Sequence, residues 1–297
     1  MALIAARTPP RPIGSIVFSV NGASDNESAR ITGLPDGFGD GEFTFQVWFR
    51  CDDGQSFADC SVAANQLNSW DNNTPAAYVS AQWWFRGNFL LDGHNNQSSN
   101  FFDGTFSIQI CNGRVRWTFG DGTAADARVG DIHACQDYSS INVVDGNWHR
   151  VTCVREFSGG DSILRLYVDG VEVDNETSTG SQTNMATTYW DSWTGFPAAQ
   201  QGWYFGAEKQ AAIGILDRYE SHYGELSEVS FFSSALPASA IANLPVPLLG
   251  GENNLVGIYR LDEQTGTTAS DDLASGGDIS LVDGSASASV TWSSVHP

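Results

Sequence analysis

The chain has 297 residues and carries 35 Asp and Glu against 14 Lys and Arg, which gives a formal net charge of −21 and a pI near 4.3. Such a negative surface repels phosphate backbones and anionic lipid headgroups, so nucleic-acid binding and attachment to a membrane surface are not expected. No apolar run approaches the ~20 residues that a membrane-spanning helix needs, and the first residues lack the basic-then-apolar order of a secretory signal.

Short segments rich in β-branched and aromatic residues recur along the chain, separated by Gly, Asp, Asn or Ser, and predict β-strands. In chain order they are 14–20, 42–49, 105–111, 114–120, 149–157, 163–170, 171–176, 203–208, 225–232, 255–261 and 289–294. One short helix is predicted over 237–244, where Pro237 suits the first turn. Many short strands with turn residues between them predict an all-β fold, a two-sheet antiparallel sandwich of the jelly-roll type.

Two long stretches, 61–104 and 178–206, interrupt this pattern and are rich in Asn, Gln and aromatic residues. Loops of this length in a compact domain are usually functional or disordered, and aromatic residues disfavour disorder. In the second stretch, rings are interleaved with a polar group at Tyr189, Trp190, Asp191, Trp193 and Phe196. This mixture suits stacking on a sugar ring, so we predict a platform for a glycan or a partner subunit. The alternative is that the rings pack the loop onto the sandwich.

Five cysteines, an odd number, leave at least one thiol unpaired in a monomer: Cys51, Cys60, Cys111, Cys135 and Cys153. A turn between Cys51 and Cys60 would allow a hairpin disulfide, and the pairing stays open. No two cysteines have C-x-x-C spacing and the histidines are scattered, so zinc and iron–sulfur sites are not expected.

Three acids, Glu172, Asp174 and Glu176, alternate along a predicted strand in the pattern E-x-D-x-E. Alternate residues of a strand share a face, as the catalytic strand of some glycosidases requires. The Asp-Gly pair at 169–170 predicts a tight hairpin just before this strand, which would turn Val171 and Val173 to the core and the acids to water. A retaining glycosidase needs two carboxyls ~5–5.5 Å apart in a walled cleft, so these acids are catalytic candidates only in an alternative reading, and no enzyme is expected.

The segment DGNWHRVTCVREFSGGDSILRLYVDGVEV, residues 145–173, resembles the central signature of laminin G-like domains in the concanavalin A-like lectin/glucanase superfamily. YFGAEKQ at 204–210 and YGELSEVSFFSSALPASAIANL at 223–244 look like the segments that close such domains. SARITGLPDGFGDGEFTFQVWFR at 28–50 looks like their opening. The resemblance covers residues 15–245 and implies a concanavalin A-like jelly roll.

The resemblance also implies a domain organisation. We expect an N-terminal arm over 1–14 and a single jelly-roll domain over 15–297. Residues 255–297 would add edge strands in a permuted order; the alternative is the start of a truncated second unit. The first is favoured because a segment of about 50 residues is too short for an independent sandwich.

A structural calcium is often found near an Asp of the closing strand in relatives, and Ser227 stands at that position here. Ca²⁺ takes several oxygen ligands. The candidates that remain are Asp25, Asn26 and Glu228.

Superfamily members without the acidic catalytic strand commonly bind carbohydrate or act in adhesion. The resemblance therefore implies a non-enzymatic surface-binding module whose partner is a glycan or a protein, with a homo-oligomer or a larger assembly as an option. A fold hosts many functions, so two alternatives stay open. They are a structural virion component, such as a phage capsid-decoration or tail protein, and a glycoside hydrolase or polysaccharide lyase. The expected location is extracellular or on a virion surface.

Overall fold

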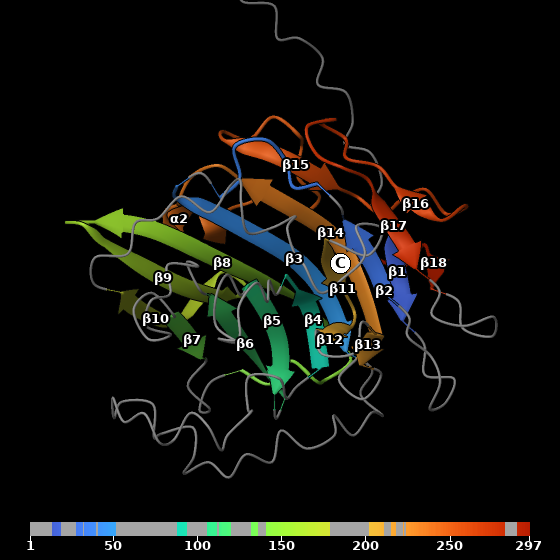
Figure 1. Ribbon diagram of the computed structural model, residues 1–297, viewed down its shortest axis with the longest axis horizontal. Coiled ribbons are helices and arrows are strands. Elements are labelled where there is room, and N and C mark those ends of the chain that lie inside the picture. Colours follow the sequence, from blue (N-terminus) through green and yellow to red (C-terminus); the bar gives the residue numbers. More distant parts are fainter. Residues whose placement is uncertain are drawn as a thin grey trace, which may run out of the picture.

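The computed structural model of the chain describes residues 14–18, 28–31, 33–39, 41–51, 88–93, 106–111, 113–119, 132–135, 141–178, 202–210, 215–217, 222, 224–282 and 290–297. Within these residues the chain forms two eight-stranded antiparallel sheets and one short helix (Figure 1). The predicted two-sheet β-sandwich is confirmed.

Sheet A has the strand order β10-β9-β8-β3-β14-β1-β18, and β15 also pairs with β14. Its strands are β1 (Ser15–Phe18), β3 (Phe43–Cys51), β8 (Trp148–Ser158), β9 (Asp161–Val168), β10 (Val171–Ser178), β14 (Gly224–Phe232), β15 (Leu255–Tyr259) and β18 (Thr291–Ser293). The middle strand, β3, pairs with β8 on one side and β14 on the other, so that Val47 is opposite both Val151 and Val229.

Sheet B has the order β16-β17-β2-β11-β4-β5-β6-β7. Its strands are β2 (Ser28–Ile31), β4 (Asn88–Asp92), β5 (Phe106–Cys111), β6 (Arg114–Phe119), β7 (Ile132–Cys135), β11 (Trp203–Phe205), β16 (Thr268–Ala269) and β17 (Ile279–Val282). A separate pair consists of β12 (Glu208–Gln210) and β13 (Ile215–Asp217). The predicted loop over 61–104 is wrong at β4, a five-residue strand within an Asn- and Gln-rich stretch.

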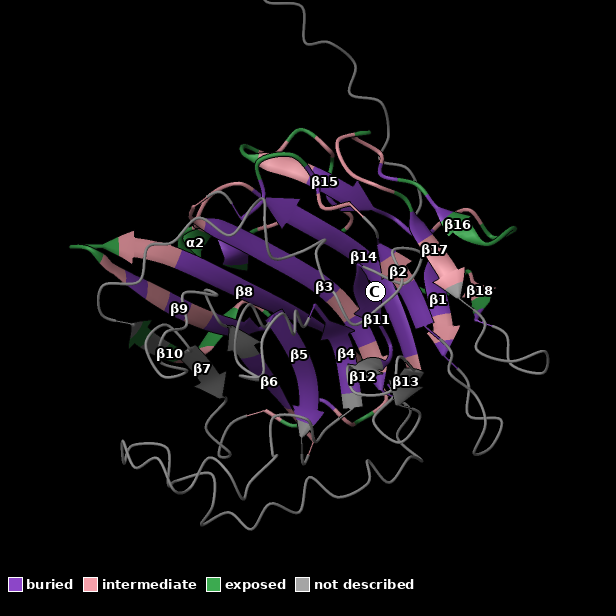
Figure 2. Cartoon of the chain, in the orientation of Figure 1, coloured by how far each residue is buried: buried purple, intermediate pink, exposed green. Residues whose placement is uncertain are grey.

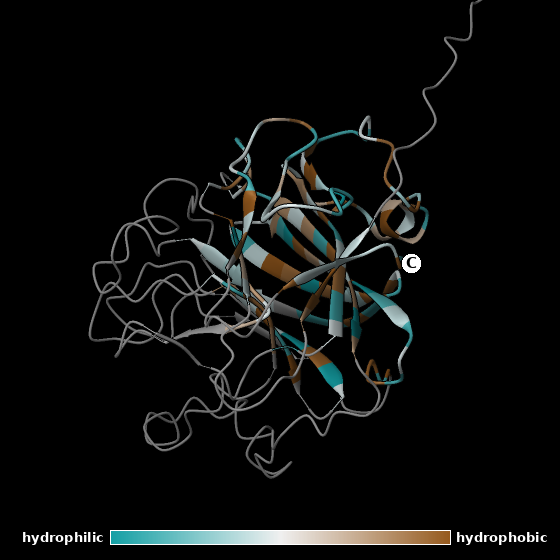
Figure 3. Cartoon of the chain, turned by 90° about the vertical axis from the view of Figure 1, so that its right-hand side faces the viewer, coloured by the Kyte–Doolittle hydropathy of each residue, from teal (hydrophilic) through white to brown (hydrophobic). Residues whose placement is uncertain are grey.

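The core lies between the two sheets, because alternate residues of a strand point to opposite faces. Phe43, Phe45 and Phe49 of β3 are fully buried there. From sheet B, Trp203 stacks on Phe106 with ring centroids 4.6 Å apart. Most strand positions in both sheets are buried (Figure 2), and hydrophobic bands alternate with hydrophilic ones along the strands (Figure 3).

Strands after residue 255 extend both sheets. β15 pairs with β14 and β18 pairs with β1 in sheet A, whereas β16 and β17 form one edge of sheet B next to β2. In Figure 1, β16, β17 and β18 lie on the right-hand side of the sandwich, away from the short helix, whereas β15 lies at the top. The domain boundaries themselves stay a prediction.

The short helix α2 (Ala238–Ala242) lies within the predicted range 237–244, with Pro237 at its N-cap. Ile241 is its buried residue, and it packs on Val154 and Tyr167 of sheet A. The helix therefore covers part of the outer face of this sheet, the face turned away from the core. None of the helices in the described part of the chain is long and apolar enough to cross a membrane.

The predicted hairpin between β9 and β10 is confirmed. Asp169 and Gly170 have φ of 52° and 80°, and both are in the left-handed region. Two such residues form the tight turn that joins neighbouring strands without splaying them. The Asp-Gly pair therefore sets the register in which β10 begins.

The three acids of β10 do not share a face, contrary to the prediction. A β-bulge between Glu172 and Asp174 shifts the register, because two residues of one strand oppose one of the other. Glu172 is opposite Tyr167, whereas Asp174 and Glu176 are opposite the core residues Leu166 and Leu164.

Of the two valines of β10 that were predicted to face the core, only one does. Val173 packs against the core, but Val171 is 58% exposed. Val171 directly follows the turn and is the first residue of β10, an edge strand of sheet A.

Candidate functional site

A pocket of about 420 Å³ opens on the outer face of sheet A. This volume falls within the range of ~300–1,000 Å³ that is typical of small-ligand sites. Its lining combines charged, phenolic and apolar groups: Glu42, Glu156, Arg165, Tyr167, Glu172, Ala235, Leu236, Pro237 and Ala238.

Strand alternation places the polar wall of this pocket. Leu164 and Leu166 of β9 face the core, so Arg165 and Tyr167 face outward. Glu172 lies on this outward face, opposite Tyr167, in the register that the Asp169-Gly170 turn sets. The bulge follows Glu172 and turns Asp174 to the other face, so of these two acids only Glu172 lines the pocket.

The opposite wall is the segment that leads into α2. Thr44 of β3 fixes this segment, because its hydroxyl donates to the Ser234 carbonyl and accepts from the Leu236 N–H, both at 2.9 Å. Ile241 then anchors the helix on Tyr167. In Figure 1, α2 lies beside the β8–β9 hairpin.

The polar side chains of the pocket are already bonded to one another. Glu172 accepts hydrogen bonds from Arg165 Nη1 at 3.1 Å, from Tyr167 Oη at 3.0 Å and from Asn175 Nδ2 at 3.0 Å. Arg165 Nε donates to Glu156 Oε2 at 3.1 Å. These contacts fix the guanidinium and the phenol before any ligand arrives.

The ionisation of the pocket follows from this network. Burial, together with the hydrogen bond and the charge of Glu172, raises the pKa of Tyr167 to about 12, so its phenol stays protonated at neutral pH. Burial opposes the charge of Arg165, but Glu156 and Glu172 outweigh it and raise the pKa of the guanidinium. The pocket therefore presents a phenol, a fixed cation and three carboxyl groups.

The predicted aromatic platform, Tyr189, Trp190, Asp191, Trp193 and Phe196, lies outside the described residues. Among the acids of β10, Glu172 belongs to the pocket and Asp174 does not. The separation of these two acids removes the shared face on which the catalytic reading depended. Of Glu176, only its backbone position opposite Leu164 is described.

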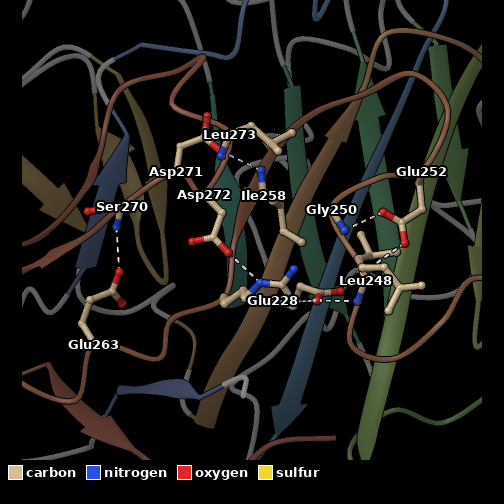
Figure 4. Close-up of polar contacts among 12 residues, drawn as sticks. Glu228, Leu248, Gly250, Glu252, Ile258, Glu263, Ser270, Asp271, Asp272 and Leu273 are labelled. Carbon is tan, nitrogen blue, oxygen red and sulfur yellow. Dashed lines mark hydrogen bonds and ion pairs between the residues drawn. The ribbon is translucent and has the colours of Figure 1, made fainter. Parts of the chain in front are cut away.

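For the predicted calcium ligands, Asp25 and Asn26 lie outside the described part, whereas Glu228 is fully buried. Its Oε2 accepts from the Leu248 N–H at 2.9 Å and lies 3.8 Å from Arg260 Nη1 (Figure 4). A neighbouring guanidinium does not suit a Ca²⁺ ligand, because the two cations would repel each other. Among the described residues, no group of three or more His, Cys, Asp or Glu could hold a metal ion. The calcium site stays a prediction.

Several acids in the segment after β14 have a structural role instead. Asp271 accepts from the N–H groups of Ile258, Leu273, Ser275 and Gly276 at 2.9–3.0 Å. Burial opposes ionisation, but these backbone hydrogen bonds lower the pKa of Asp271. Figure 4 shows similar contacts of Glu252 with Gly250 and of Glu263 with Ser270. Some of the acidic side chains of the chain thus stabilise loops by accepting hydrogen bonds from their backbone N–H groups.

The Trp-His and Tyr-Val-Asp-Gly motifs meet in the fold. His149 Nδ1 lies 2.8 Å from Asp169 Oδ2, and its Nε2 lies 3.0 Å from Asp145 Oδ1. Asp169 Oδ1 also accepts from the Arg150 N–H at 2.8 Å. Burial opposes protonation, but the two aspartates raise the pKa of His149. These motif residues therefore fasten β8 to the β9–β10 turn.

The side chains of two cysteines, Cys51 and Cys153, are described, and both are free and buried. Cys51 therefore makes no disulfide with Cys60 in this structure, contrary to the hairpin bridge considered from the sequence. Burial raises the pKa of both Cys51 and Cys153, which keeps the thiols protonated and unreactive.

The outer face of sheet B carries a second polar set that the sequence did not single out. Tyr204 of β11 is opposite Arg30 of β2 and Asp92 of β4, and Arg116 donates to Gln109 at 3.4 Å. Tyr204 and Asp92 are 3% and 1% exposed. The pocket on sheet A combines a cavity of about 420 Å³ with charged lining groups, so it is the better candidate.

Two face-to-face antiparallel sheets define a β-sandwich of the jelly-roll type. The family described as the concanavalin A-like lectin/glucanases superfamily matches residues 89–242, more than half of the chain. The chain belongs to this superfamily, which confirms the resemblance found in the sequence. None of the curated proteins matches the sequence.

Among solved structures, the chain is similar to a proposed carbohydrate binding protein from Bacteroides ovatus, with a TM-score of 0.51 and 14% identity over 92% of this chain and 60% of that one. The chain thus spans 60% of that protein's length. A heptameric SAP-like pentraxin from Limulus polyphemus gives a TM-score of 0.48 and 14% identity over 91% and 95% of the two chains. The CBM40 of a Ruminococcus gnavus IT-sialidase gives 0.42 and 11% over 77% and 95%. At these identities the likeness shows the fold alone.

Proposed function

We propose that the protein is a non-enzymatic carbohydrate-binding module and that its pocket on sheet A holds a sugar unit. The pocket lining is the observation that carries this proposal. Glu156, Glu172 and Arg165 are planar polar groups that can accept from and donate to sugar hydroxyls. The apolar edge at Leu236 and Pro237 can contact the C–H surface of the sugar ring.

The fixed geometry of the polar groups also favours binding. Side chains that must be ordered on binding cost about 0.5–1.5 kcal/mol each. Arg165 and Tyr167 are held by their hydrogen bonds to Glu172, so less of this cost remains.

Membership of a superfamily of lectins and glucanases fits both binding and hydrolysis. The bulge in β10 supports binding, because it places Glu172 and Asp174 on opposite faces of the sheet. Two carboxyls on opposite faces cannot flank one glycosidic bond.

We extend the proposal to the aromatic platform at 189–196, as a second contact for a longer glycan or for a partner subunit. The location outside the cell or on a virion surface stays a prediction. So does the alternative of a structural virion component.

Filling the pocket with a large side chain tests the proposal. Ala238 is exposed and lines the pocket, whereas its neighbour Ser239 is exposed and does not. We expect the wild-type protein to bind at least one glycan class on an array, and Ala238→Trp to weaken that binding at least about tenfold. Ser239→Trp, the matched control, should bind like the wild type.

Two results would contradict the proposal. One is a wild-type protein that binds no glycan. The other is an Ala238→Trp variant that folds and binds as the wild type does.

A further inference from the structure

The charge balance of the pocket restricts its ligand further. Its lining holds the carboxyl groups of Glu42, Glu156 and Glu172 and one guanidinium, that of Arg165, which gives a formal charge of −2. Arg165 is shared between two of these carboxylates, at 3.1 Å from each. Its positive charge is therefore largely compensated within the pocket wall.

Two carboxylate oxygens of the pocket keep their capacity to accept. Glu42 uses Oε1 to accept from the Phe157 N–H at 2.8 Å, and Glu156 uses Oε2 to accept from Arg165. Their other oxygens, Oε2 of Glu42 and Oε1 of Glu156, make no hydrogen bond within the described part of the chain. A ligand therefore meets two acceptors that each carry negative charge.

From this arrangement we infer that the pocket selects a sugar unit with a free ammonium group, such as a 2-amino sugar, and rejects acidic sugars. This inference rests on the proposed function. An ammonium group offers three N–H donors and a positive charge to the two acceptors. The carboxylate of an acidic sugar would instead meet the net negative charge of the wall.

A metal ion fits the negatively charged pocket less well than an amino sugar does. No set of three His, Cys, Asp or Glu side chains in the described residues comes close enough to hold one. A sugar ring, in contrast, can also contact the apolar edge at Leu236 and Pro237, which offers no ligand to a metal ion.

The expected size of the selectivity follows from the exposure of the groups. The side chain of Glu156 is 40% exposed, so water screens its charge. One exposed ion pair changes an affinity by about 1.4- to 5-fold, and two pairs by about 2- to 25-fold. This preference must shrink as salt is added, because salt screens exposed charges.

The test compares three oligosaccharides of equal length: an oligomer of glucosamine, the same oligomer after full N-acetylation, and an oligomer of galacturonic acid. Titration calorimetry is run at a pH where the amines are charged, at low and at high salt. We expect the glucosamine oligomer to bind most tightly and the acidic oligomer most weakly, with a smaller difference at high salt. Ala238→Trp should remove this binding.

Charge-neutral variants locate the preference. Glu42→Gln and Glu156→Gln should each lower the ratio of amino to acetylated affinity by about 1.4- to 5-fold. Gln retains an oxygen for the bonds to Phe157 and Arg165, and circular dichroism checks that the variants fold. Asp278→Asn removes an exposed acid just before β17, a strand of the other sheet, and should leave the ratio unchanged.

Each outcome separates the inference from the proposed function. Equal or tighter binding of the acetylated or acidic oligomer would overturn the amino-sugar preference and leave carbohydrate binding intact. If a lysine-rich peptide displaces the glucosamine oligomer at a lower concentration than free glucosamine oligomer does, the pocket prefers the ammonium group of a peptide, and the inference of an amino sugar is overturned. If the wild type binds none of the oligomers and no glycan on the array, the proposed function itself fails.

Discussion

Replacing Glu228 by Gln should flatten the pH dependence of the free energy of unfolding. The Glu228 side chain is fully buried, and its Oε1 has no hydrogen-bond partner in the described structure. Arg260, the nearest cation, lies at 3.8 Å and makes a closer contact, at 2.6 Å, with Asp272. Its charge is thus already compensated.

The magnitude follows from the pKa of this carboxyl. Burial raises it from 4.5 to about 7, against the opposing effects of the Leu248 hydrogen bond and of Arg260. A carboxyl whose pKa is higher in the folded state contributes stability that is fully present below pH 4.5 and is lost as the pH rises through 7. Each pKa unit is worth ~1.4 kcal/mol, so the loss amounts to about 3 kcal/mol.

Urea unfolding of the wild type and of Glu228→Gln between about pH 4 and pH 8 measures this loss. The wild type should lose about 3 kcal/mol relative to the variant across this range. Asp278→Asn controls for the removal of one negative charge from a chain of net charge −21. A difference between wild type and variant that stays constant, or that changes in the opposite direction, would refute the reasoning, because it would mean that Glu228 is ionised and paired in the folded state.

Three further substitutions test other parts of the structure. Asp169→Asn should lower the pKa of His149, which NMR titration measures. Because the wild-type pKa is raised, the contribution of His149 to stability is present below about pH 6.5 and lost above the folded pKa. An unchanged pKa in the variant would contradict the contact between His149 and Asp169. Glu172→Gln should lower the pKa of Tyr167 from about 12 toward 10, seen as a change in tyrosinate absorbance, and identical titrations would show that the hydrogen bond is not formed. Trp203→Ala should cost ~3–5 kcal/mol in denaturant unfolding, and a cost below about 1 kcal/mol would mean that the ring is not part of the core.

The strands that the sequence predicted best are those with the clearest alternation. β3 and β9 place apolar and polar residues on opposite faces, and the Asp-Gly pair at 169–170 marks the turn that follows β9. The sequence prediction missed β2, β4, β7, β13, β16 and β17, because strands of two to five residues carry too little periodicity to stand out from their surroundings.

The candidate site could be predicted only in part. The alternation of Arg165 and Tyr167 with apolar neighbours already indicates that both face outward. The bulge at Glu172 leaves no sequence signal, because it arises from pairing with β9 rather than from local propensity. The approach of Leu236 depends on how α2 packs, and such long-range packing is not encoded in a local pattern.

A crystal structure of the chain with the oligosaccharide that binds most tightly on the array is the most direct test of the central claim, that a sugar occupies the pocket on sheet A. We predict density for a sugar ring between Arg165, Tyr167 and Pro237, with hydroxyl or amino groups within hydrogen-bond distance of Glu42 and Glu156. Density for the glycan on another surface, with this pocket filled only by water, would contradict the account.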